Sequence, residues 1–406
     1  VSALAALGAA DWLNWMMLGI IQGFAQGFSI LMAQEFGAGN VKRLKKVVGN
    51  AVGLSAASAV LLLIAGESIV FPVLSLLQTP GEIIGQSMLY LRIMFAGVPI
   101  VMAYNLLASI LRALGDGKTP LHAMITAAAV NIVLDIIFVM AFGWGIAGAA
   151  AATLIAQFCS SIYCYVYIRK IEILSLCRED FRWEKELDWK LILLGLPMAF
   201  QNAIISIGGM IVQAVVNGFG VIFIAGFTAT NKLYGVLEVA ATSYGYAMIT
   251  YVGQNLGAGK IDRIKKGMRS AMFIAMITAA VIAFCMLVFG HGILGCFISG
   301  SQEEVDKTMA IAYHYLFIMS ICLPILYILH VIRAALQGMG DTVLPMVSGI
   351  AEFVMRTGTA ILLPLALGEE GIFYAEILAW AGADVILVVS YFIRMKKFTA
   401  QMGGGD

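Results

Sequence analysis

The feature that most constrains this chain is a series of apolar runs of about 20 residues or more, which recur along its whole length. Runs of this length are typical of helices that cross a membrane. The 406 residues are 61% hydrophobic and 12% charged, whereas soluble domains are about half apolar and about a quarter charged. The sequence therefore predicts an all-α polytopic membrane protein rather than a set of soluble domains.

Glycine, proline and charged residues divide the apolar runs into eleven expected helices. Pro99, Pro197, Pro324 and Pro364 fall inside them and predict bends. Pro99 and Pro324 occupy equivalent places in an internal repeat, which favours a bend shared by both copies. The helices are expected at residues 1–34, 46–77, 82–114, 120–142, 146–170, 189–217, 221–254, 264–298, 303–337, 343–366 and 371–395.

One polar junction occurs twice in the chain. The stretch QEFGAGNVKRLKKVVGNAV, residues 34–52, is identical at eight of nineteen positions to QNLGAGKIDRIKKGMRSAM, residues 254–272. A second block repeats at an offset of 225 residues, and Asp116 corresponds there to Asp341. The repeat predicts two like-oriented six-helix bundles, related by a pseudo-two-fold axis along the membrane normal.

The repeat also predicts the domain organisation. A first lobe is expected at residues 1–170, a cytoplasmic linker at 171–188, a second lobe at 189–398 and a tail at 399–406. Helix 189–217 opens the second lobe, but no counterpart precedes Val1. Twelve transmembrane helices are therefore expected in the parent protein and eleven here, with the first helix absent.

The basic residues lie on alternate junctions between the expected helices. These junctions hold 21 of the 25 Lys and Arg residues, whereas the opposite junctions carry mainly Glu and Asp. By the positive-inside rule the basic side is cytoplasmic, which places both termini of the parent protein in the cytoplasm. The basic groups are residues 42–46, Arg112 with Lys118, residues 169–190, residues 260–269, Arg333, and residues 394–397.

Asp135 lies in the middle of the apolar stretch AAAVNIVLDIIFVMAF. An ionised carboxylate there is costly unless it is paired or neutralised. Asn131 is four residues earlier and therefore shares the same helix face. Asp135 is a functional candidate, and the structural alternative is a carboxyl that hydrogen-bonds to a neighbouring helix.

Four features together resemble the multidrug and toxic compound extrusion (MATE) family, in particular its bacterial branch named for a DNA-damage-inducible protein. They are the QxxGAG junction with its basic run, the GD-x-x-x-P junction, the NIVLDIIF helix and the six-plus-six repeat. The resemblance implies a MATE-like fold in the bacterial plasma (inner) membrane. It also implies an antiporter that exports organic cations or amphiphilic drugs by alternating access, driven by inward H⁺ or Na⁺ and without a cofactor.

In the resembled family, an Asp, an Asn four residues before it and a Thr eighteen residues after it line an ion site in the first lobe. Asp135, Asn131 and Thr153 match these positions. The resemblance thus implies a carboxyl that carries a proton, or oxygen ligands that hold Na⁺. The repeat aligns Asn131 and Asp135 with Arg356 and Ala360, so ion coupling is expected mainly in one lobe.

Other polar residues within apolar segments are candidates for a substrate cavity. Glu352 and Arg356 are four residues apart and predict an ion pair, whose role as a structural bridge or as a gate stays open. Glu376 and Asp384 are interpreted as packing or interface groups. The candidates for the cavity are Asp11, Gln213, Glu238, His330, Glu352 and Arg356.

The closest alternative is a lipid-linked precursor flippase of the same superfamily, which would need several cationic residues along its cavity. Only Arg92, Lys232 and Arg356 are expected within helices, which argues against it. No GxSxG or HExxH motif supports an intramembrane enzyme. The expected partners are a small amphiphilic substrate and membrane lipid, with no nucleic acid, and the chain is expected to be a monomer.

Overall fold

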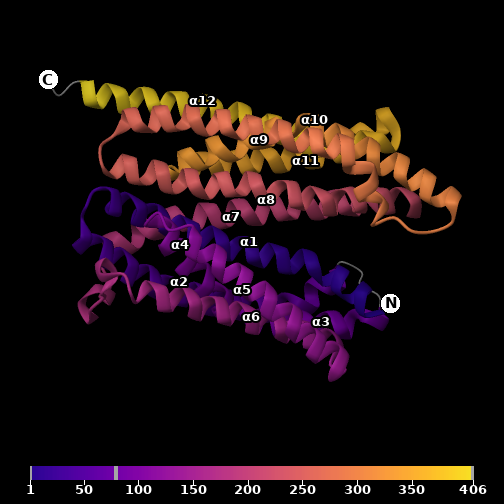
Figure 1. Cartoon of the computed structure of the whole chain (residues 1–406), viewed down its shortest axis with the longest axis horizontal. Helices are drawn as coiled ribbons and strands as arrows, with labels where there is room; N and C mark the ends of the chain where they lie inside the picture. Colours follow the sequence, from indigo (N-terminus) through magenta and orange to yellow (C-terminus); the bar gives the residue numbers. More distant parts are fainter. Residues whose placement is uncertain (1, 77–80, 404–406) are drawn as a thin grey trace. The chain divides into compact units, whose positions relative to one another are not determined.

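The computed structural model describes residues 2–76 and 81–403 (Figure 1). Every regular element in these two ranges is a helix, as the apolar runs predict. Residue 1, the end of the predicted helix 46–77 and residues 404–406 of the predicted tail lie outside the described residues. The α-helices are α1 (Ser2–Gly37), α2 (Val41–Leu76), α3 (Gly81–Ala96), α4 (Val98–Ala113), α5 (Lys118–Asp135), α6 (Gly145–Ile168), α7 (Lys185–Val216), α8 (Val221–Gly257), α9 (Ile261–Gly295), α10 (Gln302–Gly338), α11 (Val343–Leu367) and α12 (Ala375–Gly403).

Four short helical segments complete the described chain. A π-helix, η1 (Ile136–Ala141), continues directly from α5. Two 3₁₀ turns, η2 (Glu172–Leu174) and η3 (Arg178–Phe181), lie in the predicted linker, and η4 (Gly368–Tyr374) joins α11 to α12. Within the described ranges, eight stretches are long and apolar enough to span a membrane, or nine if α3 and α4 count as one broken span.

Each of the eleven predicted helices is present, but the third is broken. Helices α3 and α4 meet at Gly97 at an angle of 47°. Pro99 falls in the first turn of α4, where its missing N–H costs no helical hydrogen bond. By contrast, α10 runs through Pro324 without a break, so the interruption is not shared between the two copies. Helix α10 contacts α8, α9 and α12.

The sequence repeat is reproduced in the backbone. Helices α1 and α8 both end in the Gly-Ala-Gly junction, and Gly39 and Gly259 both have φ +69°, a conformation that favours glycine. At the second repeated junction, the carboxylates of Asp116 and Asp341 each accept a backbone N–H at the start of the next helix. The Gly-Ala-Gly junction therefore ends a helix, and the Gly-Asp junction starts one. Each occurs once in each half of the chain.

Asp116 caps the start of α5. Its carboxylate accepts hydrogen bonds from the backbone N–H groups of Lys118 and Thr119, both at 3.0 Å, and from the Thr119 hydroxyl. Partial burial acts to raise the pKa of Asp116, but these hydrogen bonds hold it below its ordinary value of 3.8.

Replacing Asp116 by Ala is expected to lower the free energy of unfolding by about 1 kcal/mol at neutral pH, because the first N–H groups of α5 lose their acceptor. Asp116→Asn, which caps equally well, is expected to cost less. Since the folded-state pKa is lowered, the stabilising contribution of the carboxylate is present above pH 3.8 and is lost as the pH falls through the lower folded value. Thermal unfolding at neutral and acid pH would measure both effects, and equal losses in the two variants at neutral pH would contradict capping.

By its internal contacts the chain divides into two compact units, Val1–Ser206 and Ile207–Asp406. The division falls inside α7 because the first part of α7 packs closely on α1. A side chain on Gly23 would meet the Ala199 backbone at 2.5 Å, and the Asn202 amide donates to the Gly19 carbonyl at 2.8 Å. Such close approach of small residues is typical of membrane helix pairs. The repeat boundary at residue 189 stays a prediction about the two halves.

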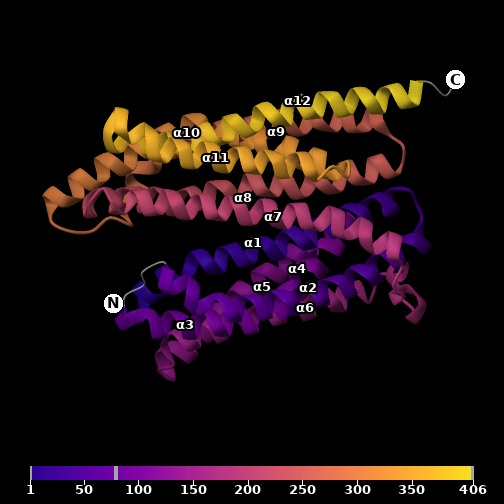
Figure 2. The ribbon, with the colours of Figure 1, turned by 180° about the vertical axis from the view of Figure 1, so that it is seen from behind.

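Within the first unit, the core joins α1 to α2, α3, α4 and α6, with Phe95 and Leu91 fully buried at its centre. Within the second unit, α10 is central and packs mainly on α8 and α9, while α12 packs on α11 and α10 (Figure 2). Tyr315 of α10 stacks on Phe227 of α8 and on Phe373 of η4, with ring centroids 4.9 and 4.8 Å apart. This aromatic stack fixes η4 against α8 and α10.

Candidate functional site

Asp135 and Asn131 lie on one face of α5, at the point where the helix changes type. The α-helix ends at Asp135, and the π-helix η1 begins at Ile136. The Asp135 Oδ1 and Asn131 Nδ2 atoms are buried, and neither has a hydrogen-bond partner among the described residues. A buried polar atom without a partner is costly, and π segments in helices are frequent at functional sites. The two observations coincide at this residue pair.

Thr153 lies on α6, which packs against α5. The Ser160 hydroxyl donates to the Ala123 carbonyl at 3.1 Å, and a side chain on Gly148 would meet Phe138 at 3.0 Å, so the two helices are antiparallel. Interpolation between these two contacts places Thr153, along the axis of α5, between the levels of Asn131 and Asp135. Its hydroxyl donates to the Ala149 carbonyl at 2.9 Å, which leaves the oxygen free to accept or to coordinate.

The structure thus places the three residues predicted for the ion site on two adjacent helices at one depth. No hydrogen bond joins Thr153 to Asn131 or Asp135 within the described chain. Gln157, one turn after Thr153, was missed by the sequence analysis, and its Oε1 is also buried without a partner. Its four-residue spacing from Thr153 is the signal that could have found it. Gln157 extends the unpartnered polar groups by one helical turn, away from Asp135.

The predicted Glu352–Arg356 ion pair is confirmed and belongs to a larger network in the second unit. The Arg356 guanidinium lies 2.9 Å from Glu352 and 2.6 Å from Glu376 of α12. Arg333 of α10 contacts the other oxygen of Glu352 at 2.7 Å. Two arginines and two glutamates therefore join α10, α11 and α12 by direct charged contacts.

Arg333 requires a correction to the sequence interpretation. It is predicted to lie at a basic junction, but it is buried in α10, five residues before the helix ends. Glu376, which is predicted to be a packing or interface group, forms an ion pair with Arg356 between α12 and α11. Neither contact was visible in the sequence, because each joins residues of different helices. The flanking residues HVIRAAL, apolar on both sides of Arg333, were the available signal.

Two more carboxyl groups accompany this network. Asp384 of α12 is buried, and its Oδ1 has no hydrogen-bond partner among the described residues. Glu238 of α8 is near enough to Glu376 and Arg356 to interact electrostatically with them. With Glu352, the surroundings hold four carboxyl groups and two arginines. The excess of acidic groups favours a cation over an anion at this place.

The other candidates for the substrate cavity, Asp11, Gln213 and His330, have neighbours in their own part of the chain. Asp11 is exposed on α1 near Tyr90 of α3. The Gln213 amide donates to the Asn217 side chain at 2.9 Å, and a ring nitrogen of His330 lies 3.0 Å from the Leu326 carbonyl of its own helix. The structure does not bring these three residues into contact with one another.

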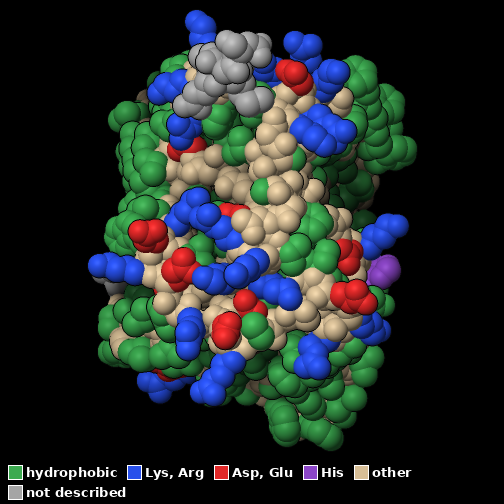
Figure 3. Space-filling view, turned by 90° about the vertical axis from the view of Figure 1, so that its left-hand side faces the viewer, with side chains coloured by type: hydrophobic (Ala, Val, Ile, Leu, Met, Phe, Trp, Pro, Cys, Tyr) green, Lys and Arg blue, Asp and Glu red, His purple; other side chains and the backbone are tan. Residues whose placement is uncertain are grey.

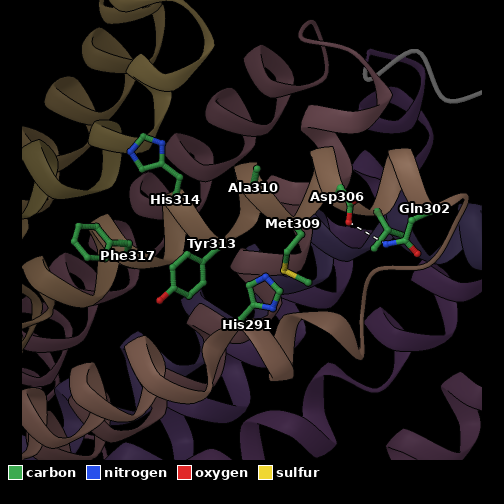
Figure 4. Close-up of a pocket in the computed structure, with 9 residues that line it drawn as sticks. His291, Gln302, Asp306, Met309, Ala310, Tyr313, His314 and Phe317 are labelled. Atoms are coloured by element: carbon green, nitrogen blue, oxygen red, sulfur yellow. Dashed lines mark hydrogen bonds between the residues drawn. The ribbon is translucent and has the colours of Figure 1, made fainter.

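A pocket of about 580 Å³ lies between α9 and α10 (Figure 4). His291 of α9 and Met309, Tyr313 and Phe317 of α10 line it, and Gln302, which also lines it, donates a hydrogen bond to Asp306. None of the residues predicted from the sequence lines this pocket. Across residues 2–76 and 81–403, no group of three His, Cys, Asp or Glu side chains could hold a metal ion, so a Na⁺ site would use amide and hydroxyl oxygens as well.

Comparison with known proteins identifies the family. A family model described as MatE matches residues 1–137 and 197–362. The chain belongs to the MatE family. MatE proteins are membrane transporters rather than enzymes, so this chain is a transporter. The resemblance drawn from the repeated junctions is thereby confirmed.

Two similar proteins and one solved structure support this assignment. The probable multidrug resistance proteins YoeA and YpnP of Bacillus subtilis (strain 168) are each 29% identical to this MatE chain. The YoeA match covers 86% of this chain and 76% of YoeA, and the YpnP match covers 91% and 82%. An outward-facing multidrug resistance MATE family transporter of the MOP superfamily superposes with a TM-score of 0.90 over 97% of this chain and 88% of that one. The two sequences are 21% identical, and the TM-score shows that the two chains share a fold.

Proposed function

We propose that this MatE protein is a secondary active efflux transporter of the bacterial plasma membrane, which exports organic cations or amphiphilic drugs in exchange for inward H⁺ or Na⁺. The names of its relatives support drug export, since YoeA and YpnP are both probable multidrug resistance proteins. The observation that carries the proposal is that the buried Asp135 Oδ1 and Asn131 Nδ2 atoms, in a stretch apolar enough to span a membrane, have no hydrogen-bond partner among the described residues. Protein groups alone do not satisfy these atoms, and a proton or a cation would.

In this mechanism Asp135 is the group that binds the coupling ion. If the ion is H⁺, the carboxyl takes the proton, and the neutral acid then donates a hydrogen bond. If the ion is Na⁺, the carboxylate of Asp135, the amide oxygen of Asn131 and the hydroxyl of Thr153 supply oxygen ligands. In either case occupancy changes the charge and hydrogen bonding of α5 at its junction with η1. A π segment tolerates a local change of helical register, which would let this change move the helix.

The acidic surroundings of the second-unit network support a cationic substrate. Arg333 and Arg356 are both bound to carboxylates, so neither is available for a pyrophosphate group. This arrangement does not favour the flippase alternative. Glu238 and Asp384 are the groups proposed to attract the substrate, since the Asp384 Oδ1 atom has no hydrogen-bond partner among the described residues and Glu238 lies within electrostatic reach of the network. Alternating access then requires that ion binding at Asp135 lower the affinity for the cation by a coupling free energy.

The transport proposal is tested with the purified protein in vesicles that contain a fluorescent organic cation. A pH gradient and a Na⁺ gradient are imposed separately, and the release of the cation is followed by fluorescence. We expect one of the two gradients to drive export well above the rate without a gradient. Equal rates with neither gradient, with the pH gradient and with the Na⁺ gradient would overturn antiport.

A further inference from the structure

The first copy of the repeated basic junction forms a pocket with the chain that follows η3. Its volume is about 510 Å³, and all its residues belong to the first unit. The linker is held beside the junction, because the Lys45 amine donates to the Ser175 hydroxyl at 3.0 Å and the Asn50 amide donates to the Asp180 carbonyl at 3.4 Å. The pocket is lined by Asn40, Lys42, Arg43, Lys46, Glu184, Glu186, Leu187 and Lys190.

Two of the four cations in this pocket are already paired. Lys46 lies 2.9 Å from Glu184, and Arg43 lies 3.1 Å from Glu35. Within the described chain, no carboxylate lies within ion-pair distance of Lys42 or Lys190, and both side chains are exposed. The Glu186 carboxylate also lines the pocket, so its lining side chains carry four positive and two negative charges, an excess of two positive charges. A group that carries negative charge would complete it.

The position of the pocket indicates which anion is at hand. It lies where α1 ends and where α2 and α7 begin, so it is at the edge of three membrane-spanning stretches. Lys and Arg side chains gather on the face of the molecule that Figure 3 shows. Phospholipid phosphates lie near the ends of membrane-spanning stretches, and basic pockets between membrane helices bind anionic headgroups. Lysine side chains suit a phosphate because they act as mobile point charges.

We propose that this pocket binds the phosphate headgroup of an anionic phospholipid. Lys42 and Lys190 supply the charge, and the ion-paired Arg43 and Lys46 supply further N–H donors. Because Lys42 is on α2 and Lys190 is on α7, a bound headgroup joins the ends of two helices that the linker connects only indirectly. The lipid would thereby stabilise the first unit.

The second copy of the junction provides a matched control in the same molecule. It has the same Gly-Ala-Gly and Lys-Lys residues, but the aromatic ring of Tyr251 occupies the space next to α9. A side chain on Gly267 would meet that ring at 2.1 Å, and the Tyr251 hydroxyl donates to the Arg263 carbonyl at 2.9 Å. Lys260 and Lys266 are therefore basic residues of the same motif outside the proposed site.

The test uses the full chain in a neutral detergent. Phosphatidylglycerol, phosphatidylcholine and inorganic phosphate are titrated separately, and bound lipid is counted by native mass spectrometry alongside thermal unfolding. We expect phosphatidylglycerol to bind and to raise the unfolding temperature, and the other two to do neither. The double variant Lys42→Gln/Lys190→Gln is expected to weaken phosphatidylglycerol binding by about 25-fold, at about fivefold per lysine. The control Lys260→Gln/Lys266→Gln is expected to bind as the wild type does.

Each other outcome would overturn the proposal. Equal weakening in both double variants would mean that only the overall charge attracts the lipid. Equal binding of phosphatidylcholine would exclude recognition of an anion, and equal stabilisation by inorganic phosphate would indicate a soluble ligand in place of a lipid. Because both lysines are exposed, we expect the variant to fold, and its unfolding temperature without lipid checks this. Lys190→Gln alone, with an expected fivefold effect, provides a second test.

Discussion

Asp135→Asn is expected to reduce gradient-driven export of a fluorescent cation by about 5- to 150-fold, the range that coupling free energies of 1–3 kcal/mol produce. The reason is that the amide keeps the shape of the carboxyl but can neither take up a proton nor carry the negative charge that attracts Na⁺. The Asp135 Oδ1 atom has no partner among the described residues, so the substitution breaks no hydrogen bond at that oxygen. Folding is therefore expected to be preserved.

The measurement is the initial rate of fluorescence change in vesicles under the gradient that drives the wild type. Glu67→Gln is the matched control, since Glu67 lies in a membrane helix of the same unit but has Arg92 as a partner, 3.9 Å away. The control is expected to retain most of the export rate. If Asp135→Asn exports as fast as the wild type while the gradient still matters, Asp135 is not the coupling group, although the antiport itself would stand.

Glu352→Gln is expected to destabilise the protein by about 3–5 kcal/mol, because it removes one partner of a buried charged network. Glu352 is 3% exposed and contacts both Arg333 and Arg356. The amide would leave Arg333 without a carboxylate, while Arg356 would keep Glu376. The desolvated charge of Arg333 is the main cost.

Thermal unfolding of the purified protein in detergent measures this effect. Glu303→Gln is the control, since Glu303 forms an exposed ion pair with Lys307 at the start of α10, and exposed pairs contribute little. An unfolding temperature for Glu352→Gln that matches the control would contradict the structural role. If the variant keeps its stability but loses export, the network acts as a gate, which is the alternative that the sequence left open.

The helices could be predicted because the membrane imposes a simple rule on the chain. A segment that crosses lipid must satisfy its own backbone and must be apolar for about 20 residues, and both requirements are local. The break at Gly97 could not be predicted from this rule, because it involves contact with another helix. Leu154 of α6 packs where a side chain on Gly97 would lie. The continuity of α10 at Pro324 was not predicted either.

The candidate ion site was partly predictable. Asp135 and Asn131 stand out in an apolar run, and their four-residue spacing puts them on one face. The change to a π-helix after Asp135 and the unpartnered Gln157 were not predicted, because they depend on helical register and on packing between α5 and α6. The roles of these residues in coupling stay a prediction that the efflux experiment tests.

By itself the sequence determined that this protein is an all-helical membrane protein with a repeated polar junction, and that resemblance led to the right family. Length, hydropathy and spacing along the chain carry that information. Only the tertiary structure showed that Arg333 is buried, that it shares Glu352 with Arg356, and that Lys42 and Lys190 meet in one pocket. These groups are far apart in sequence, and the charge of a side chain does not reveal which distant residue will neutralise it. Packing brings such residues together, so their partners could only be found in three dimensions.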